Sequence, residues 1–478
     1  MNARLAAVAV VLVSIVAACG TGGGEPLDVR ALIAGAPSRP ASGAGSLDDA
    51  SDVATGGLGA EGTSTAASPG AAGAAGAHGA DAGGITGSGP SAGTVEIGVR
   101  YVTGADQLVN LLGAQGFSVP DTKAMAQAMI DDINARGGLA GLQIVPVWHA
   151  YDASDPAGTA TQEQTACSFF TEDHHVPVVV SPIFSSEVLQ TCLAERGVVL
   201  VDENYGFFDM ALAPDTYFVP GYPDPVRAAG ALVDDLVARG FFGDTPRIGI
   251  TMKDSPDRNR VAQGIEAALA RHGLKVADEI RYTSDHPEAI GSGILRFRAT
   301  GVSHVFVLDI GGLESGVLMQ AAEIQGYRPK YALDTRNSLD YLRKNVPVAQ
   351  LHGAAGLGWF PASDVGRGPG AEPGEPEARC ADVMRAAGVE LRDSGNDRIA
   401  YATCDVFLAL AAGANRGGAV DAGAIRAGIE SLGAFRPTGT FASRFGPGRH
   451  DGTTHARRIA FDDGCACFRY AGDLVAIG

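Results

Sequence analysis

From Thr94 onward, strand-like segments, some of them continuous apolar runs, alternate with segments that have the 3.6-residue period of helices. The strand patterns lie at 95–101, 142–147, 176–180, 198–201, 247–252, 275–282, 304–308 and 331–333. The helix patterns between them lie at 122–136, 185–196, 224–239, 258–272, 287–300 and 313–325. Strands that are separated by helices pair in parallel, so this order predicts an α/β fold. Because the series runs twice, it predicts two doubly wound parallel-sheet lobes that face each other across a cleft.

The chain before this alternation has a different composition. No Phe, Tyr or Trp occurs before Tyr101, although the 478 residues include 18 Phe, 11 Tyr and 2 Trp. A stretch without aromatic side chains, rich in Gly, Ala and Ser, cannot bury enough apolar surface to offset its chain entropy. Residues 19–93 are therefore predicted to form a flexible tether, and the folded part to begin at residue 94.

The first residues resemble an export signal. A short basic segment at 2–4 precedes an apolar run at 5–16, which is too short for the ~20 helical residues that span a bilayer. The run ends in Val-Ala-Ala-Cys, which resembles the bacterial lipobox, so residues 1–18 are predicted to be a lipoprotein signal peptide. Cys19 would then be diacylated and would anchor the exported chain to the outer face of the cell membrane. The alternative is an ordinary signal peptide with a chance cysteine.

Six cysteines remain after Cys19, and six cysteines allow fifteen pairings. Disulfides are favoured outside the cytoplasm, and among the possible pairings we expect sequence neighbours to pair. The expected bonds are Cys167–Cys192, Cys380–Cys404 and Cys465–Cys467. The alternative is a metal site built from Cys465, Cys467 and either His450 or His455. We expect no metal and no cofactor.

Charge and motifs exclude two further classes of function. The formal net charge is −18, from 36 Lys+Arg against 54 Asp+Glu, and no cluster of basic residues provides a surface for phosphates. We therefore expect no nucleic-acid partner. The sequence contains no His-Glu-x-x-His motif, and no nucleophile elbow lies at a strand-to-helix turn. An enzyme is therefore not expected.

Four segments resemble one known family. Residues 128–139 resemble its first helix, which ends in an Asn-x-x-Gly-Gly-x turn, and residues 151–156 resemble its Asp-x-x-x-Asp-Pro turn. Residues 179–186 look like its strand and Ser-containing ligand loop, and residues 323–329 are similar to a helix-ending Gly-Tyr-x-Pro turn. Over residues 95–478 the chain thus resembles type I periplasmic substrate-binding proteins of the branched-chain amino-acid (Leu/Ile/Val) receptor class.

This resemblance implies a division of the chain and a motion. The chain would cross between the lobes near 217–221, 353–359 and 435–440. Lobe 1 would combine residues 94–218 and 357–436, and lobe 2 would combine residues 219–356 and 437–478. Three crossing segments would restrict the motion to hinge closure around a ligand.

In lobe 1, polar residues follow two strands. Ser185 and Ser186 begin a helix, where hydroxyl and free N–H groups bind carboxylates well, and the family places its ligand carboxylate at this loop. The alternative is a plain helix cap. Asn204 and Tyr205 lie where the family has its next ligand contacts, and the alternative is that they are turn residues.

In lobe 2, charged residues follow two further strands. Asp309 and Asp334 could pair with a ligand ammonium group or could cap the next helix. Arg336 could neutralise Asp334 or could bind an anionic ligand. Trp359, near a crossing segment, is expected to pack in the core rather than on the ligand.

The chain departs from the family at two ligand loops. Residues 102–107 replace its Gly-Pro-x-Ser-Gly, and residues 253–258 replace an aromatic residue followed by Gly. The resemblance implies capture of a small polar ligand (amino-acid-like, an amide or an organic anion) for an ABC permease. The alternative is a cell-surface sensor or scaffold of the same fold that binds a protein partner.

Overall fold

A computed structural model describes residues 93–105, 119–155, 157–283, 286, 288–367 and 373–478. The signal peptide, Cys19 and the tether expected from the sequence lie outside these residues, except that residue 93 is described. Within the described ranges, no helix is both long enough and apolar enough to cross a bilayer.

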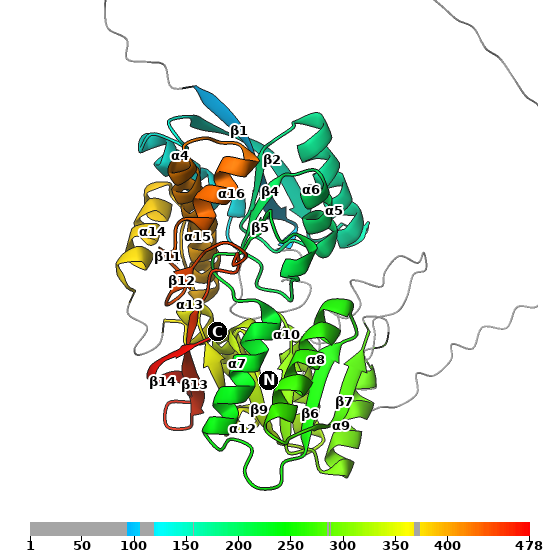
Figure 1. The fold of residues 1–478 in the computed structure, drawn as a ribbon. Helices are drawn as coiled ribbons and strands as arrows, with labels where there is room; N and C mark the ends of the chain where they lie inside the picture. Colours follow the sequence, from blue (N-terminus) through cyan, green and yellow to red (C-terminus); the bar gives the residue numbers. More distant parts are fainter. Residues whose placement is uncertain (1–92, 106–118, 156, 284–285, 287, 368–372) are drawn as a thin grey trace, which may run out of the picture. The chain divides into compact units, whose positions relative to one another are not determined.

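The first lobe is built on a sheet of five parallel strands in the order β2-β1-β3-β4-β5. These strands are β1 (Thr94–Thr103), β2 (Gln143–Asp152), β3 (Val178–Ser181), β4 (Val199–Asp202) and β5 (Tyr217–Phe218). Helices α5 (Gly158–Ser168) and α6 (Glu187–Glu195) pack together beside the sheet. On the other side lie α4 (Thr122–Ala135), α14 (Glu375–Ala386), α15 (Ser394–Gly417) and α16 (Ala422–Glu430) (Figure 1).

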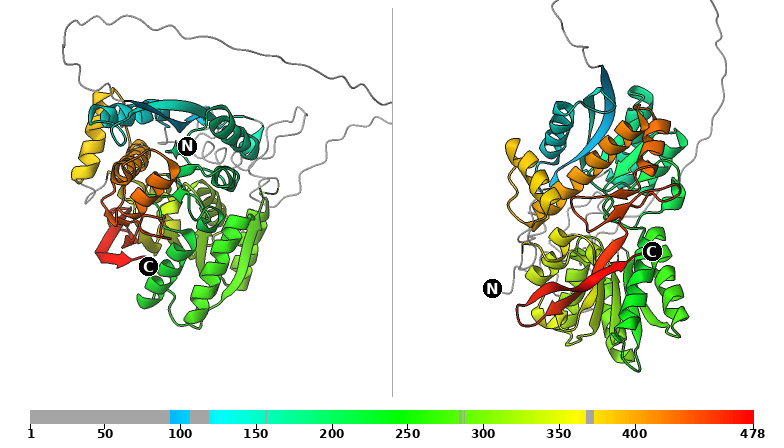
Figure 2. Two further views of the ribbon diagram at one scale, coloured as in Figure 1. Left: turned by 45° about the horizontal axis from the view of Figure 1, so that its top comes forward. Right: turned by 60° about the vertical axis from the view of Figure 1, so that its left-hand side comes forward.

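The second lobe is built on a seven-stranded sheet in the order β14-β13-β10-β9-β8-β6-β7. Its parallel strands are β6 (Ile248–Lys253), β7 (Val276–Tyr282), β8 (His304–Leu308), β9 (Lys330–Asp334) and β10 (Ala355–Gly358). Two antiparallel strands, β13 (His455–Asp462) and β14 (Cys467–Ala476), extend the sheet beside β10 (Figure 2). Its helices are α7 (Pro225–Ala238), α8 (Pro256–Arg271), α9 (Glu288–Thr300), α10 (Leu313–Ile324), α11 (Leu339–Asn345) and α12 (Val348–Leu351).

Smaller elements complete the described chain. They are α13 (Pro361–Asp364), the strand pair β11 (Ala434–Phe435) and β12 (Ser443–Arg444), the π-helical turn Phe169–Asp173 and the 3₁₀ turns Met210–Leu212 and Thr335–Asn337. The predicted fold class is confirmed, because both large sheets are doubly wound and the strands differ from the predicted ranges by only a few residues at their ends.

The turn after α4 contains the Asn-x-x-Gly-Gly-x sequence, and its contacts show why this sequence folds as it does. Asp121 caps the helix, since its side chain accepts a hydrogen bond from the Ala124 N–H at 2.9 Å, as the sequence predicts. Asn134 holds β2 through both backbone groups of Ile144, with a donor–acceptor distance of 2.7 Å to the N–H and 3.1 Å to the carbonyl oxygen. Gly138 has a φ of 76°, and a Cβ there would lie 1.9 Å from the Leu142 oxygen. Only glycine fits this position.

The chain passes between the two sheets three times, after β5, after β10 and after α16. The first and third passages run side by side, because the Val219 N–H donates to the His450 oxygen at 2.9 Å and the Gly452 N–H donates to the Val219 oxygen at 2.7 Å. Trp359, which follows β10, is 1% exposed and packs in the core. The residue boundaries expected for the two lobes stay predictions.

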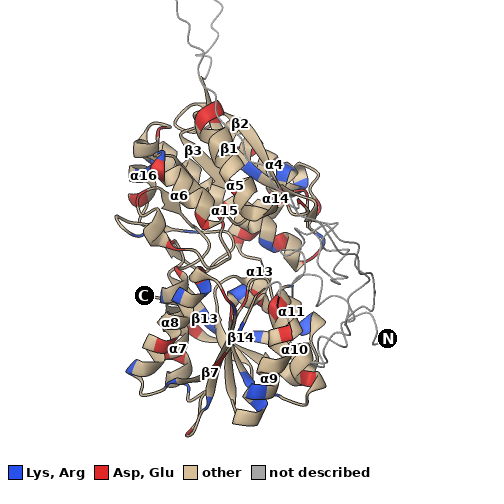
Figure 3. Cartoon of the chain, turned by 90° about the vertical axis from the view of Figure 1, so that its right-hand side faces the viewer, with Lys and Arg blue, Asp and Glu red and all other residues tan. Residues whose placement is uncertain are grey.

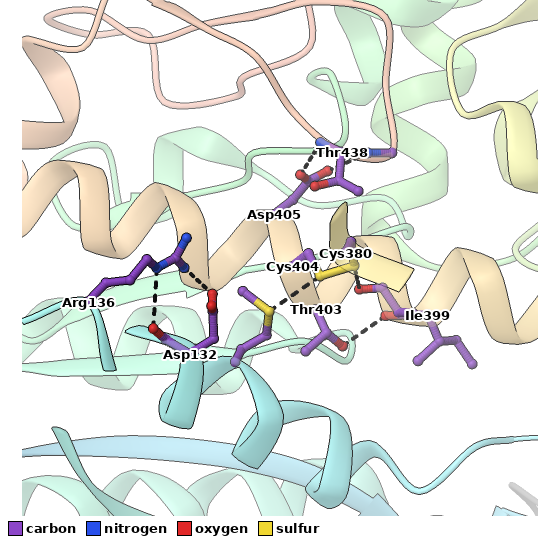
Figure 4. Close-up of a disulfide and its surroundings, with 11 residues drawn as sticks. Asp132, Arg136, Cys380, Ile399, Thr403, Cys404, Asp405 and Thr438 are labelled. Carbon is purple, nitrogen blue, oxygen red and sulfur yellow. Dashed lines mark hydrogen bonds and ion pairs between the residues drawn. A yellow bond between two sulfur atoms is a disulfide. The ribbon is translucent and has the colours of Figure 1, made fainter. Parts of the chain in front are cut away.

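The six described cysteines form the three expected disulfides, Cys167–Cys192, Cys380–Cys404 and Cys465–Cys467. Cys380–Cys404 joins α14 to α15, and the Cys404 sulfur lies 3.4 Å from the sulfur of Met129 in α4 (Figure 4). Because Cys465 and Cys467 are bonded to each other, neither offers a thiolate to a metal. Among the described residues, no group of three His, Cys, Asp or Glu side chains is arranged to hold a metal ion.

Two buried carboxyl groups lie against the passages between the sheets. Asp405 of α15 accepts hydrogen bonds from the backbone N–H groups of Thr438 and Gly439 (Figure 4). Asp364 accepts hydrogen bonds from the Phe360 N–H at 3.1 Å and from the Tyr470 hydroxyl at 2.5 Å. Burial raises the pKa of both carboxyls to about 7.

These carboxyls predict a pH dependence of stability. In the unfolded chain they ionise near pH 4, whereas the folded protein keeps their protons up to about pH 7. Folding therefore takes up protons in this window, so their contribution to stability is largest below pH 4 and is lost as the pH rises to 7. We expect Asp405→Asn to flatten the fall in the urea midpoint between pH 5 and pH 8. Unfolding curves of both proteins across that range measure the difference.

The comparison between variant and wild type is necessary because some histidines act in the opposite direction. Burial lowers the pKa of His149 and of His304, so these residues stabilise the folded state as the pH rises through 6.5. They are present in both proteins, and the difference isolates Asp405. An unchanged pH slope in Asp405→Asn would show that this carboxyl is already ionised at pH 5.

Candidate ligand-binding site

A cavity of about 440 Å³ lies at the carboxyl ends of β3 and β4. The first lobe lines it with residues of the loop after β3 and the start of α6, with residues 204–208 after β4, and with Thr159 and Ala160 of α5. The second lobe contributes Asp257 of α8 and Ile310, which follows β8. Ligands of doubly wound proteins bind beyond the carboxyl ends of strands, so this cavity is the candidate site.

A buried ion pair supports the loop after β3. Arg100, in the middle of β1, is 1% exposed, and its guanidinium lies 2.7 Å from a carboxylate oxygen of Glu163 in α5. It also donates hydrogen bonds to the Ser185 hydroxyl at 3.0 Å and to the Phe184 oxygen at 3.3 Å. Burial raises the pKa of Glu163, and the charge of Arg100 acts against this shift. Neither residue was predicted from the sequence. The one signal in the sequence was the position of Arg100, a charged residue within an apolar strand.

Ser185 and Ser186 both line the cavity, and both also have structural bonds. The Ser185 hydroxyl accepts the Arg100 hydrogen bond and donates to the Ser181 hydroxyl at 3.2 Å. The Ser186 hydroxyl caps α6 by accepting a hydrogen bond from the Val188 N–H at 3.2 Å. Ser186 is therefore a helix cap in this structure. Contact of either serine with a ligand stays a prediction.

Asn204 and Tyr205 are brought to the same cavity. The Asn204 amide donates to the Ser185 oxygen at 2.9 Å and to the Tyr217 hydroxyl at 3.1 Å, and its oxygen accepts from the Gly206 N–H at 2.8 Å. This amide thus shapes the loop after β4. The Tyr205 ring lies on the cavity wall, with the guanidinium of Arg398 4.9 Å from its centre.

Asp309 lies just outside the cavity lining and turns back onto its own loop. Its carboxylate accepts hydrogen bonds from the Ile310 N–H at 2.5 Å and from the Ser315 N–H and hydroxyl at 2.8 and 2.6 Å. Burial and the charge of Glu314 raise the pKa of Asp309 to about 7. A role of Asp309 in ligand binding stays a prediction.

Asp334 and Arg336 form a pair beyond β9, outside the cavity lining. Asp334 accepts from the Arg336 N–H at 2.8 Å, and the two side chains form an ion pair at 3.2 Å. The Arg336 guanidinium, which is almost fully buried, also donates to the Gly206 oxygen of the first lobe at 3.2 Å and to the Pro223 oxygen at 2.8 Å. Arg336 therefore neutralises Asp334 and connects the two lobes, and contact of either residue with a ligand stays a prediction.

The loop after β4 reaches across to the second lobe. Phe207 is 7% exposed, and the guanidinium carbons of Arg258 and Arg336 lie 5.3 and 5.7 Å from its ring centre. Arg260 of α8 forms an ion pair with Asp209 at 3.3 Å and donates to the Phe208 oxygen. These contacts attach the loop that carries Tyr205 to the second lobe.

Comparison of the sequence with known families gives a match over residues 107–460, and the matching family is described as periplasmic binding protein. The chain belongs to the periplasmic binding protein family. This family binds solutes without transforming them, so the chain is a binding protein and not an enzyme. A comparison with curated proteins gave no significant match.

Solved structures of binding proteins share the fold at low sequence identity. The substrate-binding protein of an Aeropyrum pernix ABC transporter is 13% identical with a TM-score of 0.62, over 80% of this chain and 96% of that one. A Thermus thermophilus branched-chain amino-acid ABC transporter protein with bound valine is 14% identical with a TM-score of 0.59, over 80% and 97%. A Streptococcus pneumoniae branched-chain amino-acid transporter binding protein in complex with isoleucine is 15% identical with a TM-score of 0.56, over 80% and 99%.

The distribution of charge on this binding protein agrees with the sequence analysis. Over both lobes, the Lys and Arg residues drawn in Figure 3 are interspersed with Asp and Glu. The ion pairs Arg100–Glu163 and Arg336–Asp334 are internal to the fold, whereas exposed pairs such as Arg385–Asp382 contribute little to stability. These interspersed charges are typical of a solvated surface.

Proposed function

We propose that this protein is an extracytoplasmic solute receptor that captures a small polar ligand in the cavity between its lobes and delivers it to an ABC permease. The observation that carries the proposal is the cavity of about 440 Å³ at the carboxyl ends of β3 and β4, which side chains of both lobes line. The volume suits a ligand of amino-acid size. Family membership and the relatives that hold isoleucine and valine support an amino-acid-like ligand, with amides and organic anions as further classes.

The proposal includes the binding residues and the place of the protein in the cell. Ser185, Ser186, Asn204 and Tyr205 would contact the ligand from the first lobe, and closure of the lobes about the three connecting segments would enclose it. A lipid on Cys19 would hold the protein at the outer face of the membrane. Mass spectrometry of the mature N-terminus tests the anchor, because diacylated Cys19 and an unmodified N-terminus differ in mass by the acyl chains.

A thermal-shift screen with amino acids, amides, short peptides and organic anions tests the binding function. A ligand at 100 times its Kd is expected to add about 2.7 kcal/mol to the free energy of unfolding, because it binds only the folded state. Tyr205→Ala should reduce that shift by removing a wall of the cavity. Phe441→Ala, at a half-buried ring outside the cavity lining, is the control and should keep the shift.

The outcome separates transport from sensing. A ligand that shifts the melting temperature in wild type and in Phe441→Ala, but less in Tyr205→Ala, supports the proposal. If no small molecule shifts the melting temperature, the receptor proposal is wrong, and a sensor or scaffold that binds a protein partner becomes the better account.

A further inference from the structure

Two carboxylates, one from each lobe, line the cavity. Glu187 lies in the first turn of α6 and Asp257 in the first turn of α8. In the described part of the chain, neither has an ion-pair partner within 4.0 Å or a side-chain hydrogen bond, and none of the lining residues is Lys, Arg or His. The charged groups on the cavity wall are therefore all negative.

Two of the basic side chains near these carboxylates, Arg260 and Arg258, have other partners, and a third, Lys253, interacts electrostatically with Asp257. Arg260 is bound to Asp209 and to the Phe208 oxygen. Arg258 donates to the Leu308 oxygen at 3.2 Å and forms an ion pair with Glu314 at 3.3 Å. A third cation, Lys253, is half-buried at the end of β6. Burial lowers the pKa of Lys253, while the charges of Glu314 and Asp257 oppose that shift.

A buried side chain on the cavity wall also carries a free acceptor. Gln190 lines the cavity and is 1% exposed. Its amide nitrogen donates to the Ser185 oxygen at 3.1 Å and to the Tyr217 hydroxyl at 3.3 Å, and its amide oxygen has no partner. A buried acceptor without a donor costs free energy until a donor reaches it. The amide nitrogen of Gln190 already donates to two protein oxygens. The amide oxygen of Gln190 is therefore the group that can accept a hydrogen bond from a ligand.

Of the two serine hydroxyls suited to a ligand carboxylate, that of Ser185 is already used, since it accepts from Arg100 and donates to Ser181. The Ser186 oxygen accepts the hydrogen bond that caps α6, which leaves its O–H as a donor. At the start of α6, Glu187 offsets the partial positive charge of the helix end. An anionic ligand would thus meet two carboxylates on the cavity wall.

The charges on the cavity wall also favour a cationic ligand. Burial raises the pKa of Glu187, the charges of Asp257 and Asp209 raise it further, and Arg260 opposes them. Glu187 and Asp257 therefore repel each other across the boundary between the lobes. A positive charge between them would replace this repulsion with two attractions.

We propose that the ligand of this cavity has a net positive charge and that its protonated amine lies between Glu187 and Asp257, with the Gln190 amide oxygen as a third acceptor. The inference rests on the proposed function and names its ligand class. An ammonium group has three N–H donors and no acceptor, which matches three acceptors. The rings of Phe184 and Phe208 on the same wall can accept a cation on their faces. Because the carboxylates belong to different lobes, the cation also favours closure.

Isothermal titration of the full chain with 1,4-diaminobutane, L-lysine, L-leucine and succinate tests this inference. We expect at least one of the two cations to bind more tightly than leucine and succinate. Glu187→Gln and Asp257→Asn should each weaken that binding at least tenfold, because each removes one of the attracting charges. Glu195→Gln at the exposed end of α6 and Asp244→Asn on an exposed loop of the second lobe remove the same charge elsewhere and should leave the Kd unchanged.

Each contrary result has a distinct meaning. Binding of leucine or succinate without binding of either cation overturns the inference and leaves the receptor function intact. Cation binding that Glu187→Gln and Asp257→Asn do not weaken also overturns it, because the amine then lies elsewhere. If none of the four probes binds, the inference is wrong, and the receptor function fails with it only if the wider thermal-shift screen is also negative.

Discussion

Replacing Arg100 by methionine is expected to lower the free energy of unfolding by about 3–5 kcal/mol, because it leaves the buried carboxylate of Glu163 without its counter-charge. Arg100 and Glu163 are 1% and 0% exposed, so water cannot take over the lost interaction. The variant also loses the hydrogen bonds to Ser185 and Phe184 that hold the loop after β3. Urea-induced unfolding, followed by circular dichroism, measures the loss.

Two further variants test the cause of this loss. In Arg100→Met/Glu163→Gln neither of the two positions carries a charge, and we expect this variant to be more stable than Arg100→Met alone. Arg385→Met removes an exposed arginine that pairs with Asp382 and should change stability by less than about 0.5 kcal/mol. If Arg100→Met unfolds at the same urea concentration as wild type, the buried ion pair does not support the loop.

Truncating Phe207 to alanine is expected to have an effect of similar size, about 3–5 kcal/mol, because it empties a packed aromatic site. The Phe207 side chain belongs to the first lobe, and it lines a small internal cavity together with apolar side chains of the second lobe. These side chains include Pro225, Ala229, Leu232, Val261, Ile265 and Phe306. The variant should therefore loosen the contact between the lobes as well as lower the free energy of unfolding. Urea unfolding measures the energy, and small-angle X-ray scattering measures the separation of the lobes.

Phe441→Ala is the matched control for Phe207→Ala. Phe441 is half-buried, and its ring contacts Tyr470 and the guanidinium of Arg457 near the sheet edge. We expect it to cost less stability than Phe207→Ala and to leave the radius of gyration unchanged. Equal losses in both variants would mean that Phe207 contributes only its own buried area and does not hold the lobes together.

Local structure was predictable from the sequence because it depends on neighbours along the chain. The alternating periodicities gave both sheets, Asp121 caps α4 as its position predicts, and the cysteines pair with their sequence neighbours. Ser185, Ser186, Asn204 and Tyr205 reached the cavity because each follows a parallel strand, and parallel strands end at the same edge of a sheet.

Contacts between distant segments were not predictable in the same way. Arg100 and Glu163 are 63 positions apart and pair only because β1 and α5 are adjacent in the fold. The position of Asp309 after a strand could not show that Ser315 would bind its carboxylate. Asp257 reaches the cavity only because the two lobes face each other, and one-dimensional periodicity does not contain that arrangement.

The claim that this binding protein holds its ligand between the lobes is tested most directly by hydrogen–deuterium exchange with and without the ligand that stabilises it most. The account predicts that protection is concentrated in residues 184–190, in residues 204–208 and in the first turn of α8, which together line the cavity. Protection centred instead on the surface between α4, α14 and α15, with none at these segments, would contradict it.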